Sequence, residues 1–194
     1  MKCALDYLVS RSEVVSGGVF VVGHSLGAAV ALYAVQSDTR VKGLVLWSPP
    51  KNHDYNVKKF IKRKDGILGS LVFRVLSRVD RVFDVSRLYR LEVAGLDLRL
   101  RFVREKLMKL DECEAVSRLC GIPLLIVIGQ SDVLVGVDEA EEVYRSANEP
   151  KTLVVVQSAD HFYRGKEQRL ISETLEWIER WSKPVKREDG HTRA

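Results

Sequence analysis

A serine between two glycines lies at a predicted strand-to-helix corner, and this corner constrains the fold more than any other part of the chain. Residues 19–22 are apolar and either β-branched or aromatic, which is typical of a strand buried on both faces. Residues 26–35 are rich in Ala and Leu and predict a helix. The segment Gly-His-Ser-Leu-Gly at 23–27 joins the two. We expect Gly23 and Gly27 to let strand and helix approach closely, where a Cβ atom would clash.

The chemistry of this corner favours an activated serine. Its geometry strains the backbone of Ser25 and exposes the hydroxyl group. The helix that follows supplies N–H donors and the positive end of its dipole. We therefore predict that Ser25 is a nucleophile and that the Leu26 N–H stabilises an oxyanion. His24 beside it is a candidate for substrate binding or for packing, rather than for proton transfer. The alternative is a tight turn that only reverses the chain.

Three further apolar runs predict strands, at residues 41–47, 122–128 and 151–156. Helical patterns cover residues 3–12, 26–35, 137–147 and 167–181. A strand–helix–strand order within about thirty residues implies a right-handed crossover and a parallel sheet. The sequence therefore predicts an α/β fold, with a mostly parallel sheet of about four strands and flanking helices.

Residues 51–120 differ from the rest of the chain. Apolar residues recur there at helical spacing, and residues 51–118 hold 17 Lys and Arg against 10 Asp and Glu. We predict a mostly helical lid insertion at 51–120, with further helices across 98–110 and 112–119, laid over a core formed by 1–50 and 121–194. The basic surplus fits a solvated helical face, or a surface for an acidic partner or an anionic membrane.

Bulk properties narrow the class of protein. The 194 residues are 46% hydrophobic and 29% charged, as in ordinary soluble domains. There is no apolar run long enough for a membrane span and no signal-peptide pattern at the start. The odd cysteines Cys3, Cys113 and Cys120 lack metal-ligand spacing, so we expect reduced thiols in a cytoplasmic protein. Neither a metal nor a nucleic-acid partner is expected.

Three of the four predicted strands are followed by residues that can act together on an acyl group. Their order along the chain is Ser25, Asp132 and His161. Working groups collect at the carboxyl ends of strands in parallel α/β sheets. A serine hydroxyl needs a base to take its proton, and the base needs a carboxylate to fix its tautomer. We predict these three roles for Ser25, His161 and Asp132.

Each role has a competitor in the sequence. Asp160 is adjacent to His161 and would struggle to point at its ring, whereas Asp138 suits the first turn of a helix. His161 itself could be a surface histidine. His53 could line a pocket but better fits a loop, and His191 belongs to the charged tail. The cysteines lie outside the corner, which disfavours a cysteine nucleophile.

Taken together, these segments resemble the α/β-hydrolase superfamily. Residues 23–27 look like its nucleophile elbow, residues 123–132 like its strand and Gly-x-x-Asp turn, and residues 158–162 like its Asp-His-Phe loop. The resemblance covers most of the chain and is nearest to lysophospholipase-like esterases and serine peptidase-like members, with residues 51–120 in the position of the lid. It implies a serine hydrolase of small carboxylic esters or related acyl substrates that needs no cofactor. A peptidase with the same triad and an inactive binding module are the alternatives.

The chain departs from the family pattern before the elbow, where few residues stand in place of several strands. The second oxyanion donor comes from a loop in that part of the family fold. Losing one such donor costs about 10²–10³ in rate. Residues 19–22 would also become an exposed apolar edge strand. We therefore expect a truncated form, a partner chain or self-association at this edge, which sedimentation would detect.

Overall fold

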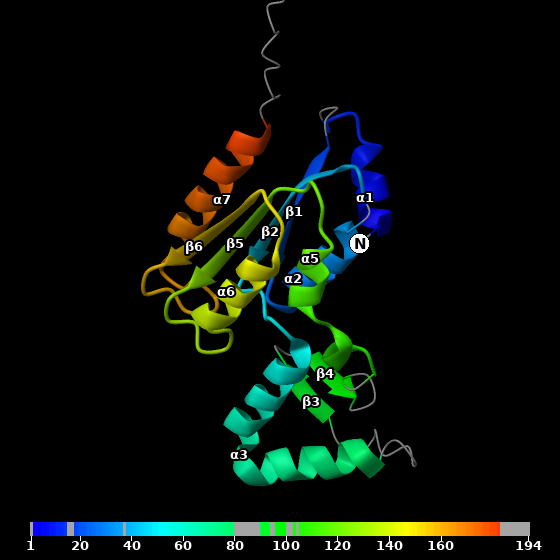
Figure 1. Cartoon of the computed structure of the whole chain (residues 1–194), viewed down its shortest axis with the longest axis vertical. Coiled ribbons are helices and arrows are strands. Elements are labelled where there is room, and N and C mark those ends of the chain that lie inside the picture. Colours follow the sequence, from blue (N-terminus) through cyan, green and yellow to red (C-terminus); the bar gives the residue numbers. More distant parts are fainter. Residues whose placement is uncertain are drawn as a thin grey trace, which may run out of the picture.

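A sheet of four parallel strands organises the molecule (Figure 1). The computed structural model describes residues 2–14, 18–36, 38–79, 90–93, 96–99, 103 and 105–182. The strands lie in the order β1-β2-β5-β6. Their bounds are β1 (Val19–His24), β2 (Val41–Trp47), β5 (Leu124–Gly129) and β6 (Lys151–Val156). The predicted α/β fold with four parallel strands is confirmed, with β5 beginning two residues later than expected.

Helices cover both faces of the sheet. Alternate strand residues point to opposite sides, and apolar side chains on both sides are buried against these helices. Leu44 and Leu46 of β2 pack in one core with α1 (Lys2–Val9), α2 (Leu26–Val35), α5 (Glu112–Ser117) and α6 (Val137–Ser146). Val45, between them, packs in a second core against α7 (Glu167–Ser182). Burial on both faces explains why β5 is apolar along its whole length.

The parallel arrangement brings the carboxyl ends of the strands to one edge of the sheet. The segments that follow β1, β2, β5 and β6 therefore meet there, and α3 (His53–Val79) lies beyond that edge (Figure 1). Gly66 bends α3, since its φ of 67° is a conformation that side chains other than glycine rarely adopt. The first half of α3 packs with Leu107 and with Leu26 in a third, smaller core.

The described residues between α3 and α5 are less helical than predicted. They include an antiparallel pair of strands, β3 (Arg90–Val93) and β4 (Leu96–Arg99), and a short 3₁₀ helix at Leu107–Lys109. Leu98 and Arg99 lie in β4 and not at the start of a helix, which corrects the expectation for 98–110. Each of these strands is only four residues long, and a helical pattern read over a longer window misses such short strands. The expected helix over 112–119 is present as α5.

Strand β1 lies at the edge of the sheet, as the sequence predicts. It pairs with β2 on one side, and the Val22 side chain is 40% exposed. An edge strand presents N–H and C=O groups to which another chain can pair. Within the described residues, no helix is both long and apolar enough to cross a membrane.

Candidate active site

Ser25 occupies the corner between β1 and α2 in a strained conformation. Its φ of 53° and ψ of −122° lie outside the regions that residues other than glycine ordinarily adopt. Two backbone hydrogen bonds hold it there: the Ser25 N–H donates to the Trp47 carbonyl, and the Ala28 N–H donates to the Ser25 carbonyl, each at 2.9 Å. The surrounding structure thus fixes a conformation that a free chain would avoid.

The two glycines of the corner differ in what they contribute. A Cβ atom on Gly23 would lie 2.4 Å from the Gly27 carbonyl oxygen and 2.8 Å from the Ala28 Cα atom. A Cβ atom on Gly27 would meet nothing within 4 Å. Close approach of strand and helix therefore requires glycine at position 23 alone. The expectation that Gly27 avoids a clash is wrong, because its Cα atom faces outward from α2.

We expect Gly23→Ala to destabilise the fold strongly and Gly27→Ala to be tolerated. The clash at Gly23 is with backbone atoms that cannot move aside, so the free energy of unfolding should fall by about 3 kcal/mol, the upper end for overpacked sites. Ala at position 27 is a better helix former than Gly, by up to about 1 kcal/mol. Urea denaturation of both variants measures the difference. Equal stability of the two variants would contradict this account of the corner.

His161 lies beside Ser25, although 136 residues separate them in the chain. Its Nε2 atom is 3.0 Å from Ser25 Oγ, and its Nδ1 atom is 2.8 Å from Asp132 Oδ2. The His161 side chain is 93% buried and that of Asp132 fully buried. The structure therefore brings the three residues predicted to act together into one chain of hydrogen bonds. With Nδ1 donating to the carboxylate, Nε2 is left to accept the Ser25 proton.

The backbone after β5 holds the Asp132 carboxylate. Its Oδ1 atom accepts the N–H groups of Leu134 and Val135, each at 2.9 Å. Burial alone would raise the pKa of Asp132, but hydrogen bonds from His161 and the Val135 N–H outweigh it and lower the pKa. Asp132 is therefore ionised at neutral pH, as the carboxylate partner of a histidine must be.

Two further residues support Asp132, and the sequence analysis missed both. Ser48, just after β2, is fully buried, and its hydroxyl helps to lower the pKa of Asp132. Ser48 Oγ is 3.0 Å from the Tyr163 hydroxyl, which donates to the Val127 carbonyl at 2.9 Å. Burial raises the pKa of Tyr163 to about 12, so this donor keeps its proton. The only sequence signal for Ser48 is its place at the end of a strand.

His24 contacts the loop that carries the histidine. Its Nε2 atom donates to the His161 carbonyl at 2.8 Å, and the two rings lie 4.9 Å apart. Burial lowers the pKa of His24, which keeps the ring neutral. The contact indicates that His24 positions the His161 loop, while its predicted role in substrate binding stays a prediction.

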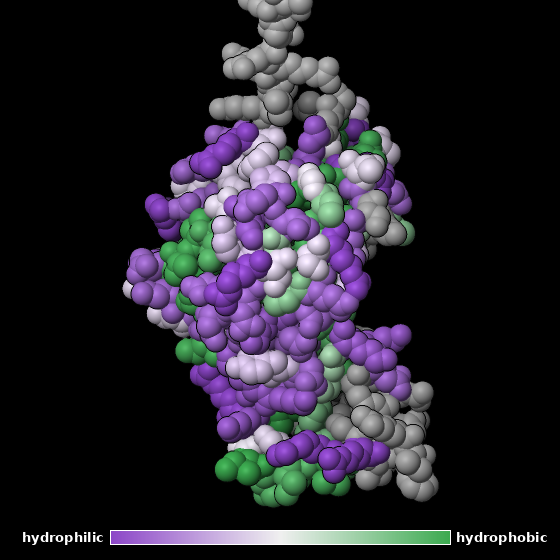
Figure 2. All heavy atoms as spheres, in the orientation of Figure 1, coloured by the Kyte–Doolittle hydropathy of each residue, from purple (hydrophilic) through white to green (hydrophobic). Residues whose placement is uncertain are grey.

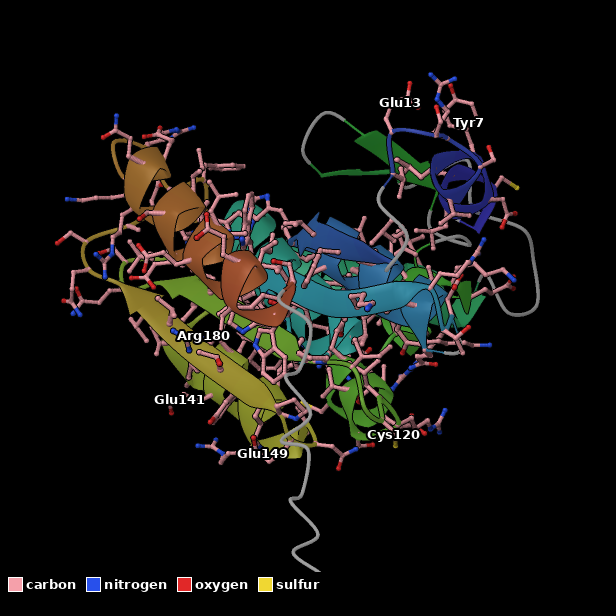
Figure 3. All side chains as sticks on the ribbon, turned by 90° about the horizontal axis from the view of Figure 1, so that it is seen from above. Tyr7, Glu13, Cys120, Glu141, Glu149 and Arg180 are labelled. Carbon is pink, nitrogen blue, oxygen red and sulfur yellow. The ribbon has the colours of Figure 1, made fainter. Side chains whose placement is uncertain are left out.

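The described residues that competed in sequence for the catalytic roles do not join the hydrogen-bonded path from Ser25 to Asp132. Asp160 accepts the N–H groups of Phe162 and Arg164, and so stays bonded to its own loop. Asp138 lies in the first turn of α6. His53 is the first residue of α3 and not a loop residue, which corrects that expectation, and its Nε2 atom lies 2.7 Å from Glu112 Oε1. Cys120 is exposed at the outer edge of the molecule (Figure 3). His191 lies outside the described residues.

Leu26 opens helix α2, so its N–H has no partner within that helix. Among the hydrogen bonds of the described part of the chain, none uses this donor. Leu26 follows Ser25 directly, so its N–H can donate a hydrogen bond to a negatively charged oxygen that develops beside Ser25 Oγ. In the same described part, no group of three or more His, Cys, Asp or Glu side chains is placed to hold a metal ion.

Comparison with known proteins places this chain among hydrolases. A family model described as serine aminopeptidase, S33 matches residues 1–164. None of the curated proteins matches the sequence. Among solved structures, the chain is similar to the esterase domain of a Rhodothermus marinus protein, with 20% identity and a TM-score of 0.60. It is also similar to Est1E from Butyrivibrio proteoclasticus, with 16% identity and a TM-score of 0.64. A further similar structure is an esterase from Pyrococcus furiosus, with 21% identity and a TM-score of 0.63.

The matches extend along most of this chain but along a smaller part of the three solved structures. They cover 92%, 93% and 94% of this chain, and 66%, 67% and 60% of the Rhodothermus, Butyrivibrio and Pyrococcus structures. The chain thus spans about two thirds or less of the length of these relatives. At such low identity the likeness shows a shared fold.

Proposed function

Because this chain belongs to the serine aminopeptidase S33 family of α/β hydrolases, we propose that it is a serine hydrolase of carboxylic esters or related acyl compounds. The observation that carries the proposal is the continuous hydrogen-bonded path from Ser25 Oγ through His161 to Asp132. In a hydrolase fold, this combination at the carboxyl edge of the sheet supports acyl transfer through a covalent intermediate.

The proposed reaction has two halves. Ser25 Oγ attacks the acyl carbon while His161 Nε2 takes the hydroxyl proton, and the carbonyl oxygen becomes an oxyanion near the Leu26 N–H. His161 then returns the proton to the leaving alkoxide, the carbon–oxygen bond breaks and an acyl-serine remains. A water molecule gives its proton to His161 and attacks the acyl carbon. The acid leaves, and the proton goes back to Ser25. Asp132 stabilises the protonated His161 throughout.

A peptidase is the second candidate, favoured by the description of the matching family model. The same three residues serve both reactions, and the difference lies in the leaving group, an alcohol for an ester and an amine for a peptide. Parallel assays on an aryl ester and on the matching aminoacyl anilide discriminate between them. Faster turnover of the anilide would favour the peptidase.

We further propose that residues 51–120 act as a lid that shapes the acyl pocket, and that another strand pairs along β1. Two contacts of α3 support the lid: Leu26 packs against the apolar cluster that includes Val57 and Ile61 of this helix, and the Arg63 guanidinium donates to the Val133 carbonyl beside Asp132. The exposed edge supports the pairing, and a strictly monomeric species in sedimentation equilibrium would argue against self-association there.

A fluorophosphonate reagent tests the proposed chemistry, because it phosphonylates only a serine whose base is in place. We expect one covalent adduct on the native protein, located at Ser25 by peptide mass spectrometry, and none on the urea-denatured protein. The exposed Ser131, next to Asp132, provides the control, since Ser131→Ala should be labelled like the wild type. Folded protein that takes no label would instead favour an inactive binding module. A label on another residue would mean that Ser25 is not the nucleophile.

A further inference from the structure

The second half of α3, beyond Gly66, exposes a row of large apolar side chains. Five form this α3 surface: Ile67, Leu68, Leu71, Val72 and Val75, which are 79%, 72%, 52%, 41% and 50% exposed. Their spacing places them on one stripe of the helix. Figure 2 shows apolar atoms gathered at the end of the molecule where this half of α3 lies.

The same half-helix already buries another apolar face. Phe73 is 3% exposed, and both Phe73 and Leu76 pack with Ile61 and Leu107 in the third core. A helix that merely covers a small core presents polar residues to solvent on its other side. This one presents isoleucine, leucine and valine, and a contiguous exposed apolar patch marks an interaction site.

The charges on the second half of α3 are of one sign. Helix α3 carries seven Lys and Arg against two Asp, and residues 66–79 include two arginines and no acidic residue. Arg74 and Arg78 of this half are both exposed. Lys58, Lys62 and Arg74 line a pocket of about 490 Å³ that both halves of α3 enclose, together with apolar side chains. Cations therefore border the apolar stripe on the helix itself.

This combination suits an anionic lipid surface better than a second copy of the chain. In a two-fold contact across the stripe, Arg74 and Arg78 of each copy would approach the same residues of the other, and residues 66–79 hold no acid to neutralise them. A bilayer with anionic headgroups supplies the opposite charge, and its acyl region accepts the apolar side chains. Both features of the α3 surface are then satisfied at once.

We propose that the α3 surface docks on an anionic lipid bilayer, with its apolar stripe in the interface and its lysines and arginines against the headgroups. Docking requires neither Ser25 nor His161, so it stands or falls independently of the proposed hydrolysis. Because α3 lies beyond the carboxyl edge of the sheet, docking would bring the candidate active site near the membrane surface (Figure 1).

Co-sedimentation with vesicles tests the proposal. We expect the wild type to bind vesicles of phosphatidylcholine mixed with phosphatidylglycerol, to bind pure phosphatidylcholine more weakly, and to lose affinity as salt is added. Leu68→Ser with Leu71→Ser should reduce the partition coefficient by about tenfold or more. The matched control is Ile171→Ser with Leu175→Ser, which removes two apolar side chains, 49% and 52% exposed, from α7. Circular dichroism checks that both variants fold.

The outcomes separate lipid from other occupants. Lost vesicle binding in the α3 variant with retained binding in the α7 variant would support the proposal. No binding of the wild type to any vesicle, or equal loss in both variants, would overturn it. A wild-type dimer that dissociates in the α3 variant, without vesicle binding, would identify a second copy as the occupant instead.

Discussion

Replacing Ser25 by alanine should reduce kcat for an activated carboxylic ester by about 10⁵–10⁶-fold, the loss found when the nucleophile of a serine hydrolase is removed. The reason is that, among the described residues, Ser25 supplies the hydroxyl that lies within hydrogen-bonding distance of His161 Nε2. KM should change little, because the Ser25 hydroxyl contributes little to ground-state binding. Steady-state kinetics on an aryl ester measures both constants.

The control for this prediction is Ser131→Ala, which leaves the path from Ser25 to Asp132 intact and should keep wild-type kcat. A Ser25→Ala protein that retains most of its activity would contradict the proposed mechanism, since the observed turnover would then come from another group. The same variant should fail to react with the fluorophosphonate reagent.

Local patterns in the sequence were enough to predict the fold class and the meeting of Ser25, His161 and Asp132. Burial on both faces makes each strand a nearly continuous apolar run, and parallel pairing brings the ends of such runs to one edge. The residues just after three of those runs therefore had to lie near one another. The edge position of β1 followed from the resemblance to a family that has further strands before this point.

Other features depend on contacts between distant segments, which no local pattern encodes. Ser48 and Tyr163 are 115 residues apart, and they come together beside Asp132 only when β2 and β6 both pair with β5. Gly23 and Gly27 look equivalent in sequence, yet only the Cα atom of Gly23 faces the neighbouring backbone. The pairing of β3 with β4 likewise overrides a sequence that reads as helical.

Asp132→Asn should reduce kcat by about 10⁴-fold while leaving the shape of the site unchanged. The two backbone N–H groups at Oδ1 require an acceptor there, so the asparagine oxygen takes that position and its NH₂ group faces His161. Nδ1 of His161 must then accept a hydrogen bond, which places the proton on Nε2. With its proton on Nε2, His161 cannot take the proton of Ser25.

Asp160→Asn is the matched control, because it makes the same chemical change in the neighbouring loop, which follows β6 and carries His161. Asp160 Oδ1 accepts the N–H groups of Phe162 and Arg164, and an asparagine oxygen can keep both bonds. This variant should therefore retain wild-type kcat and wild-type fluorophosphonate labelling. Equal losses in the two variants would assign the damage to a general disturbance of the site, and a larger loss in Asp160→Asn would make Asp160 the carboxylate partner of His161. A loss confined to Asp132→Asn would mean that the tautomer of His161 is set through Oδ2 of Asp132, because the rest of the hydrogen-bonded path is the same in both proteins.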